Sequence, residues 1–207
     1  MKKFFAVAIL ALATLSINAQ DFKTFRFGPT AGLNVAKATS LDASMTIGFN
    51  VGARAEYNFS DNFYLGAGLL FTQKGYKWKG IMPNGANLKT NPCYIEIPIN
   101  AGYRYNFNDK VSVFGEVGPY IGFGIAGKYK AEGYESAKFF GDEGKVMAAT
   151  LFGPGVEPKR VDFGLGFAAG VEISKFQVRL GYELGLTNIY TGGCKNRNLF
   201  VGLSYMF

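Results

Sequence analysis

Hydrophobic and polar residues alternate along most of this chain. Within 45–58, Ile47 and Phe49 stand at odd positions with other apolar residues, whereas Arg54 and Glu56 stand at even positions. A repeat of two residues places alternate side chains on opposite faces of a β-strand. This alternation predicts eight long strands, at about 25–36, 45–58, 63–76, 93–107, 111–128, 160–173, 176–188 and 198–207.

The connections between the predicted strands alternate in length. Short connections rich in turn-forming residues lie at 60–62, 108–110 and 174–175, and long ones at about 37–44, 77–92, 129–159 and 189–197. Strands of ten or more residues joined in this way are typical of barrels that span an outer membrane. We therefore predict an all-β fold, an eight-stranded antiparallel up-and-down transmembrane β-barrel. Its N- and C-termini are expected on the periplasmic side.

The charged residues of these strands fall on the face opposite the large apolar side chains. An arginine facing lipid at mid-membrane costs about 2–4 kcal/mol, whereas charges inside a barrel can pair with one another. The pattern therefore predicts that the apolar face contacts lipid and that the interior is polar and filled. The predicted interior charge network consists of Arg26, Arg54, Glu56, Glu96, Arg104, Glu116, Asp162, Glu172, Arg179 and Glu183.

The first residues have the layout of an export signal. Lys2 and Lys3 precede an apolar run over 4–15, and the small residue Ala19 ends the segment. This layout is typical of a cleaved signal peptide, and the apolar run is too short to span a membrane as a helix. We predict a signal peptide at 1–19, one barrel domain at 20–207 and an outer-membrane location.

Composition limits the chemistry that is open to this chain. It contains 28 Gly, 20 Phe and 12 Tyr but no His, and its formal net charge is +7. Without histidine, Ser–His and Asp–His catalysis is excluded. We therefore expect no enzymatic activity, no cofactor and no metal site. The basic residues are spread along the chain, which argues against nucleic acid as a partner.

The last predicted strand ends in aromatic residues at alternate positions, Tyr205 and Phe207. This ending resembles the recognition signal that outer-membrane barrels present to their insertion machinery. We therefore expect three kinds of partner for the barrel: the insertion machinery, outer-membrane lipid and lipopolysaccharide.

Five segments occur in order along the chain: Phe71-Thr72-Gln73-Lys74-Gly75, Tyr94-Ile95-Glu96-Ile97-Pro98-Ile99, Gly118-Pro119-Tyr120-Ile121-Gly122, Asp162-Phe163-Gly164 with Gly170-Val171-Glu172, and Gly181-Tyr182-Glu183-Leu184-Gly185-Leu186-Thr187-Asn188-Ile189. Together they resemble the PorT-like outer-membrane β-barrel family of Bacteroidota. The resemblance implies an outer-membrane barrel and a link to a protein-secretion apparatus. It implies no active-site residue.

The two cysteines, Cys93 and Cys194, both fall at the predicted outer end of the barrel. In an oxidising envelope, two cysteines on the same side can form a disulfide. Their strands, however, lie on opposite sides of an eight-stranded barrel. The sequence therefore leaves a disulfide and two free thiols as alternatives.

One predicted outer loop is basic and aromatic, and it contains no acidic residue. Its candidate binding residues are Lys74, Lys77, Trp78, Lys79 and Lys89. Such a loop can bind the phosphates of lipopolysaccharide or an acidic glycan through charge and stacking. It can equally be a solvated loop with a tryptophan at the membrane boundary.

Three hypotheses for function follow from these features. The first is a non-enzymatic outer-membrane barrel with a surface-interaction or envelope-structural role. The second, suggested by the resemblance, is an accessory subunit with a partner in a secretion or assembly complex. The third is a soluble lipocalin-like ligand-binding barrel, which requires a polar exterior and an apolar interior.

Overall fold

The computed structural model of the chain describes residues 25–39, 43–79, 87–127, 129–132, 151–152, 159–190 and 193–207. Its strands are β1 (Phe25–Ala38), β2 (Ala43–Asn58), β3 (Phe63–Gln73), β4 (Tyr76–Trp78), β5 (Asn87–Thr90), β6 (Cys93–Asn106), β7 (Val111–Ala126), β8 (Tyr129–Glu132), β9 (Val161–Ile173), β10 (Phe176–Gly185) and β11 (Asn196–Tyr205). The described part of the chain has no helix long and apolar enough to cross a membrane. The predicted signal peptide lies outside the described residues.

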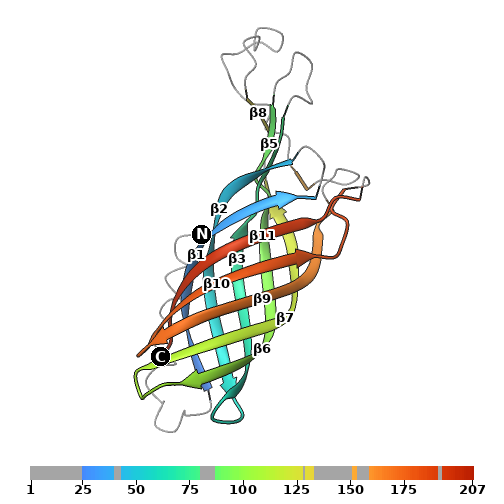
Figure 1. Cartoon of the computed structure of the whole chain (residues 1–207). Helices are drawn as coiled ribbons and strands as arrows, with labels where there is room; N and C mark the ends of the chain where they lie inside the picture. The colour runs from blue at the N-terminus through green and yellow to red at the C-terminus, as the bar shows by residue number, and fades with distance from the viewer. Residues whose placement is uncertain are drawn as a thin grey trace, which may run out of the picture.

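Eight of these strands form a closed antiparallel barrel (Figure 1). The order around the barrel is β1, β2, β3, β6, β7, β9, β10 and β11, and β11 pairs again with β1. Neighbouring strands also follow one another along the chain, except that β4, β5 and β8 intervene in the long connections. The predicted eight-stranded up-and-down barrel is therefore confirmed.

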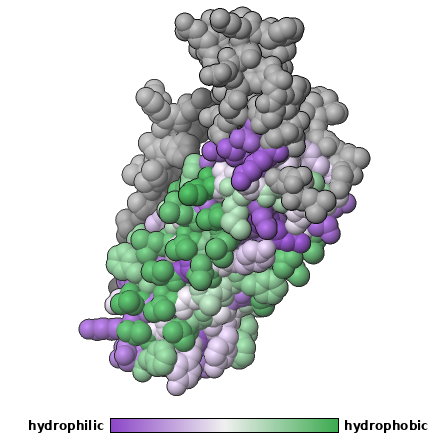
Figure 2. Space-filling view, turned by 45° about the horizontal axis from the view of Figure 1, so that its top comes forward, coloured by the Kyte–Doolittle hydropathy of each residue, from purple (hydrophilic) through white to green (hydrophobic). Residues whose placement is uncertain are grey.

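Side chains alternate between the outer surface and the interior of the barrel. On β2, Ile47 is 73% exposed, whereas Thr46 beside it is 7% exposed. Figure 2 shows apolar residues covering much of the barrel wall on this face, with hydrophilic residues gathered toward the upper end. The exterior is apolar and the charged residues of the strands are buried, so the soluble lipocalin-like alternative is wrong.

Exposed aromatic residues gather at the end of the barrel that carries the short turns. They are Tyr57, Phe59, Phe63, Tyr103, Tyr105, Phe107 and Phe176. The Phe63 and Tyr103 rings pack edge to face, with their centroids 5.0 Å apart. Such a belt is typical of a barrel at the boundary between lipid and water.

Bulky interior side chains lie next to glycines on neighbouring strands. Tyr64 of β3 pairs with Gly102 of β6, where a Cβ atom would collide with the Tyr64 ring. Tyr120 of β7 pairs with Gly164 of β9, where a Cβ atom would lie 2.6 Å from the Tyr120 ring. An eight-stranded barrel has room for little more than its own side chains, so these glycines make space for the large residues.

The strand predicted at 63–76 is shorter than expected. β3 ends at Gln73, and Lys74 and Gly75 separate it from β4. The register with β2 shifts by one residue across this break, from the Asn50–Thr72 pair to the Met45–Tyr76 pair. Lys74 still continues the inward-facing series of β3, and its side chain is fully buried in the barrel. The other barrel strands lie within three residues of their predicted bounds.

Strands β4, β5 and β8 extend β2 beyond the barrel at the end with the long connections. β4 pairs with the start of β2, β5 with β4, and β8 with β5. We call β4, β5 and β8 the outer sheet; β5 and β8 project from the barrel in Figure 1. Its base packs through Tyr76 and Trp78 against Tyr190 and Ile189. The predicted loops at 77–92 and 129–159 therefore contain regular structure.

Substituting an outer-face residue by arginine tests whether that face contacts lipid. Val201 lies midway along β11, between Leu33 and Leu180, so Val201→Arg is expected to lower the free energy of unfolding by about 2–4 kcal/mol. The measurement is denaturant unfolding of protein folded into lipid vesicles. Phe59→Arg, at a short turn near the interface, is the control and is expected to cost about 0–1 kcal/mol. Equal losses in the two variants would contradict the assignment.

Candidate functional site

The ten residues of the predicted charge network all lie inside the barrel, where a fifth cation, Lys74, joins them. They divide into two groups along the barrel. The arginine network consists of Arg26, Arg54, Arg104, Arg179, Glu56, Glu116 and Glu172. The lysine cage consists of Lys74, Glu96, Asp162 and Glu183.

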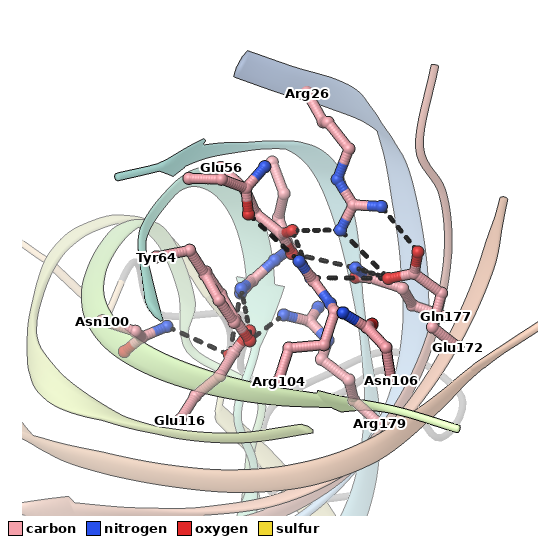
Figure 3. Close-up of polar contacts among 12 residues, drawn as sticks. Arg26, Glu56, Tyr64, Asn100, Arg104, Asn106, Glu116, Glu172, Gln177 and Arg179 are labelled. Atoms are coloured by element: carbon pink, nitrogen blue, oxygen red, sulfur yellow. Dashed lines mark hydrogen bonds and ion pairs between the residues drawn. The ribbon is translucent and has the colours of Figure 1, made fainter. Parts of the chain in front are cut away.

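Glu56 of β2 links three other strands of the arginine network (Figure 3). Its Oε2 accepts hydrogen bonds from Arg26 Nη2 at 2.7 Å and from Arg104 Nη2 at 2.6 Å. Its Oε1 accepts one from Gln177 Nε2 at 2.9 Å. Arg26 and Gln177 also donate to Glu172 of β9. These bonds tie β1, β2, β6, β9 and β10 together across the barrel interior.

Glu116 of β7 is the second centre of the arginine network. Its carboxylate accepts hydrogen bonds from Arg54 Nη2 at 2.8 and 3.0 Å and from the Tyr64 hydroxyl at 3.0 Å. Arg179 Nη1 lies 3.6 Å from the same carboxylate. Two buried arginines therefore share one glutamate, and the whole network has four arginines against three glutamates.

The lysine cage surrounds one ammonium group with three carboxylates. Lys74 Nζ lies 2.6 Å from Glu96 Oε2, 2.9 Å from Glu183 Oε2 and 3.3 Å from Asp162 Oδ2. Lys74 and Asp162 are completely buried, and the two glutamates are less than 10% exposed. A buried charge is tolerated only where it is paired and hydrogen-bonded, so the lysine and the carboxylates depend on one another.

Aromatic and amide side chains complete the lysine cage. Lys74 Nζ lies 4.4 Å from the centroid of the Tyr120 ring, which suits a cation–π contact. The Tyr120 hydroxyl and Asn196 Nδ2 both donate to Asp162 Oδ2, at 3.3 and 2.8 Å. Asn198 Nδ2 donates to Glu183 at 3.0 Å. The neutral donors help to stabilise the acidic charge that one lysine leaves uncompensated.

The two groups carry opposite excess charge and meet at a small cavity. Its volume is about 30 Å³, and Arg54, Arg179, Glu116, Glu96 and Glu183 are among its lining residues. A cavity of this size has room for only a few water molecules. The barrel interior is therefore filled largely by its own side chains, with net positive charge near the short turns and net negative charge near the long connections.

Lys74 was predicted in an exposed binding loop, and this prediction is wrong. The side chain is fully buried and forms the centre of the cage. A signal for this position was present, because Gly66, Gly68 and Thr72 occupy even, inward-facing positions and Lys74 continues the series. The predicted network also had six acids against only four arginines, an imbalance that called for a further cation.

The remaining predicted loop residues belong to the outer sheet. Lys77 and Trp78 lie in β4, Lys79 follows it and Lys89 lies in β5. Lys77 is directly paired with Lys89 in the register of the two strands. Trp78 is partly buried and packs edge to face on Tyr76 at 5.0 Å, so its ring anchors the sheet.

The two cysteines are free thiols in the structure, so the disulfide alternative is not realised. Cys93 begins β6, is buried and lies 3.8 Å from Gln73 Nε2. Cys194 instead packs against the cluster of Ala38, Tyr76 and Ile189. The two thiols thus belong to different packing environments.

The aromatic residues at the C-terminus pack together on the outside of the barrel. The Tyr205 and Phe207 rings are 5.1 Å apart and edge to face, and Phe207 also lies 5.5 Å from Phe27 of β1. The backbone N–H of Phe207 donates to the carbonyl of Phe27 at 2.9 Å. These contacts hold the chain end against the seam between β1 and β11.

No group of three or more His, Cys, Asp or Glu side chains in the described ranges is arranged to hold a metal ion. In the lysine cage, where three carboxylates meet, the Lys74 ammonium contacts all three. The acidic side chains are thus engaged by a cation of the chain itself.

A closed antiparallel barrel with an apolar exterior, an aromatic belt and a polar, filled interior defines an integral outer-membrane β-barrel protein. The chain belongs to the outer membrane protein beta-barrel domain family, whose family model matches residues 18–191. The outer-membrane location and the contact of the barrel wall with lipid follow from this membership. None of the curated proteins matches the chain.

Several solved structures are similar to the chain at low sequence identity. Ail of Yersinia pestis, in complex with the heparin analogue sucrose octasulfate, is 17% identical; the match covers 89% of this chain and 99% of Ail, with a TM-score of 0.44. Neisserial surface protein A (NspA) is 16% identical over 87% of this chain and 97% of its own, with a TM-score of 0.44. OprG from Pseudomonas aeruginosa is 12% identical over 88% and 95%, with a TM-score of 0.46.

Removing the caged ammonium tests the mutual dependence within the lysine cage. Lys74→Met leaves three buried carboxylates without their cation and is expected to lower the free energy of unfolding by about 3–5 kcal/mol near neutral pH. Protonation of carboxylates relieves their repulsion, so the loss should shrink at about pH 4.5. The measurement is denaturant unfolding in vesicles at both pH values. Lys79→Met, at the exposed position that follows β4, is the control and should change stability by less than about 0.5 kcal/mol. A loss that does not depend on pH would contradict the cage.

Proposed function

We propose that this protein is a non-enzymatic outer-membrane barrel that binds acidic glycan at the cell surface through its outer sheet. The observation that carries the proposal is the register of lysines across that sheet. Lys77 of β4 is directly opposite Lys89 of β5, and Lys89 is directly opposite Lys130 of β8. Lys79 follows β4 and is exposed.

Lysines directly opposite one another on neighbouring strands repel and destabilise the sheet that carries them. An anionic ligand would relieve this repulsion and gain charge-assisted hydrogen bonds. Alternation along β4 puts Lys77 on the face opposite Tyr76 and Trp78, which pack on Tyr190. The aromatic face thus supports the sheet, and the proposed ligand of the lysine face is an anionic glycan such as the sugar-phosphate chain of lipopolysaccharide.

The filled interior supports a role on the outside of the barrel instead of transport through it. The cavity of about 30 Å³ is bounded by ion pairs that join opposite walls, such as Arg54 of β2 with Glu116 of β7. A passage for solutes would require these buried pairs to separate, which costs several kcal/mol for each pair.

The proposed orientation places the outer sheet outside the cell and both termini in the periplasm. Its support is the contrast between the two ends of the barrel, since outer-membrane barrels have short periplasmic turns and longer outer loops. A signal peptide at 1–19 would deliver the chain to the periplasm. Tyr205 and Phe207 would then present the aromatic ending that the insertion machinery recognises.

The PorT-like resemblance gains support from the lysine cage. Each of the five resembling segments contributes one residue to the cage or its wall: Lys74, Glu96, Tyr120, Asp162 and Glu183. The segments are thus scaffold features that converge in space, and we propose that the chain is PorT-like on this basis. An accessory role in a secretion complex is the alternative function. In that case, crosslinking in intact membranes should capture a stoichiometric partner, and a monomeric barrel under the same conditions would reject it.

Charge reversal on the outer sheet tests glycan binding. The double variant Lys77→Glu, Lys89→Glu should bind the delipidated polysaccharide of lipopolysaccharide at least about tenfold more weakly, because each basic residue contributes about 1 kcal/mol toward an anionic surface. Affinity is measured by calorimetry on detergent-solubilised protein. The matched control, Lys110→Glu with Lys175→Glu, changes the same charge at the short turns and should bind as wild type does. Unchanged affinity in the outer-sheet variant would refute the proposal.

A further inference from the structure

A second basic surface lies on the outside of the barrel wall, at the seam between β1 and β11. Lys37 of β1 is directly opposite Arg197 of β11. One step further along, Thr39 and Lys195 exchange hydrogen bonds, from Thr39 N to Lys195 O and from Lys195 N to the Thr39 hydroxyl. Three cations therefore occupy adjacent positions at the end of the barrel with the long connections. We call Lys37, Lys195 and Arg197 the rim triad.

Burial shows that Lys37 and Arg197 of the rim triad are on the lipid side of the wall. Ala36 and Asn198, which flank Lys37 and Arg197 along their strands, are each only 1% exposed and face the interior. Alternation therefore puts Lys37 and Arg197 on the outer face. Two residues further into the membrane on that face, Leu199 is 44% exposed and begins the apolar series that continues with Val201. The triad sits where the lipid-facing surface changes from apolar to charged.

The rim triad is held in place and lacks acidic partners. Arg197 Nη1 donates to the backbone carbonyls of Gly185 at 2.8 Å and Asn196 at 3.0 Å, which orients the guanidinium. Within the described ranges, none of the three cations forms an ion pair with an Asp or Glu. On its other side, Arg197 is paired with the apolar Leu184. Directly opposed like charges are unfavourable unless an anion lies between them.

A ligand that suits the rim triad carries an anionic group such as a phosphate at the level where the apolar wall ends, and it brings an excess of negative charge. A zwitterionic phospholipid would bring an ammonium group that needs an acidic partner, and the rim triad offers none among the described residues. Lipid A carries phosphates on a sugar core directly above its acyl chains and brings no ammonium group. Arg and Lys side chains bind phosphate through charge-assisted hydrogen bonds, and the acyl chains could pack on the apolar wall below.

We infer that Lys37, Lys195 and Arg197 form a binding site for a phosphate group of lipid A in the outer leaflet. The inference rests on the proposed orientation, in which the long connections face outward. It concerns a different surface and a different part of lipopolysaccharide from the outer sheet, because the rim triad meets the lipid anchor at the membrane boundary. The barrel would thus bind a lipid A molecule at the seam between β1 and β11.

The test compares lipid A with and without its phosphates. Bisphosphorylated or dephosphorylated lipid A is titrated into detergent-solubilised protein, and bound copies are counted by native mass spectrometry. Wild type should bind the bisphosphorylated form about tenfold more tightly than the dephosphorylated form. Lys37→Gln with Lys195→Gln should lose most of that preference, since each cation near an anionic headgroup contributes several-fold in affinity. Arg197 is left intact because it also bonds to the backbone.

The matched control is Lys110→Gln with Lys175→Gln, which removes two charges at the opposite end of the barrel and should retain the wild-type preference. Heat-modifiable gel mobility verifies that each variant is folded. A wild type that binds both lipid A forms equally would overturn the inference, and this comparison needs no variant. A rim variant that keeps the full preference would overturn it as well.

Failure of this inference is distinguishable from failure of the proposed function. The outer-sheet variant Lys77→Glu, Lys89→Glu should keep its preference for bisphosphorylated lipid A, and loss of that preference would place the phosphate on the outer sheet instead. The rim variant should in turn bind delipidated polysaccharide as wild type does. Orientation is tested separately, by thiol labelling of Lys110→Cys in intact cells, where labelling above that of wild type would contradict the proposed orientation. The detergent titration does not depend on orientation.

Discussion

The structure depends on pairing charges where water cannot reach them. Lys74 is fully buried and is stable there because three carboxylates and the Tyr120 ring surround it. Those carboxylates would in turn repel one another without the ammonium group. Because the charges find partners in the interior, the outer wall can consist almost entirely of apolar side chains and face lipid without the cost of a buried ion. The apolar lipid-facing surface therefore depends on the ion pairs in the interior.

The same pairing explains the register of the strands. A shift of one residue would turn every side chain of a strand to the other face. In β2 such a shift would move Arg54 and Glu56 into lipid and would separate them from Glu116 of β7 and Arg104 of β6. Glycines also constrain the register. A residue with a Cβ atom at position 102 would collide with the Tyr64 ring, so this ring must lie opposite a glycine. The interior ion pairs and the fit of bulky side chains beside glycines therefore select the same strand register. A mispaired strand would lose both the ion pairs and the fit.

Most of the barrel could be predicted from the chain, because a period of two residues and the cost of a lipid-facing charge are local rules. The rules reach their limit at Lys74, where the strand breaks and the register with β2 shifts. The acids that pair with Lys74 lie on β6, β9 and β10, which are distant in sequence. The outer sheet was also missed, since β4, β5 and β8 are short and take their order from pairing across long connections. Whether Cys93 and Cys194 form a disulfide depends on their packing, which their spacing in the sequence does not reveal. In the structure both are free thiols.

Because the interior is filled, any ligand must bind on the outside of the barrel. The two ends of the barrel differ in the residues that they expose. The short-turn end carries a belt of aromatic side chains such as Tyr103 and Phe107, which suit the region where lipid meets water. The opposite end carries basic residues directly opposite one another on neighbouring strands, on the outer sheet at Lys89 and on the wall at Arg197. Like charges held in register weaken the isolated protein. Their placement at the end with the long connections is the basis for proposing anionic ligands on that side.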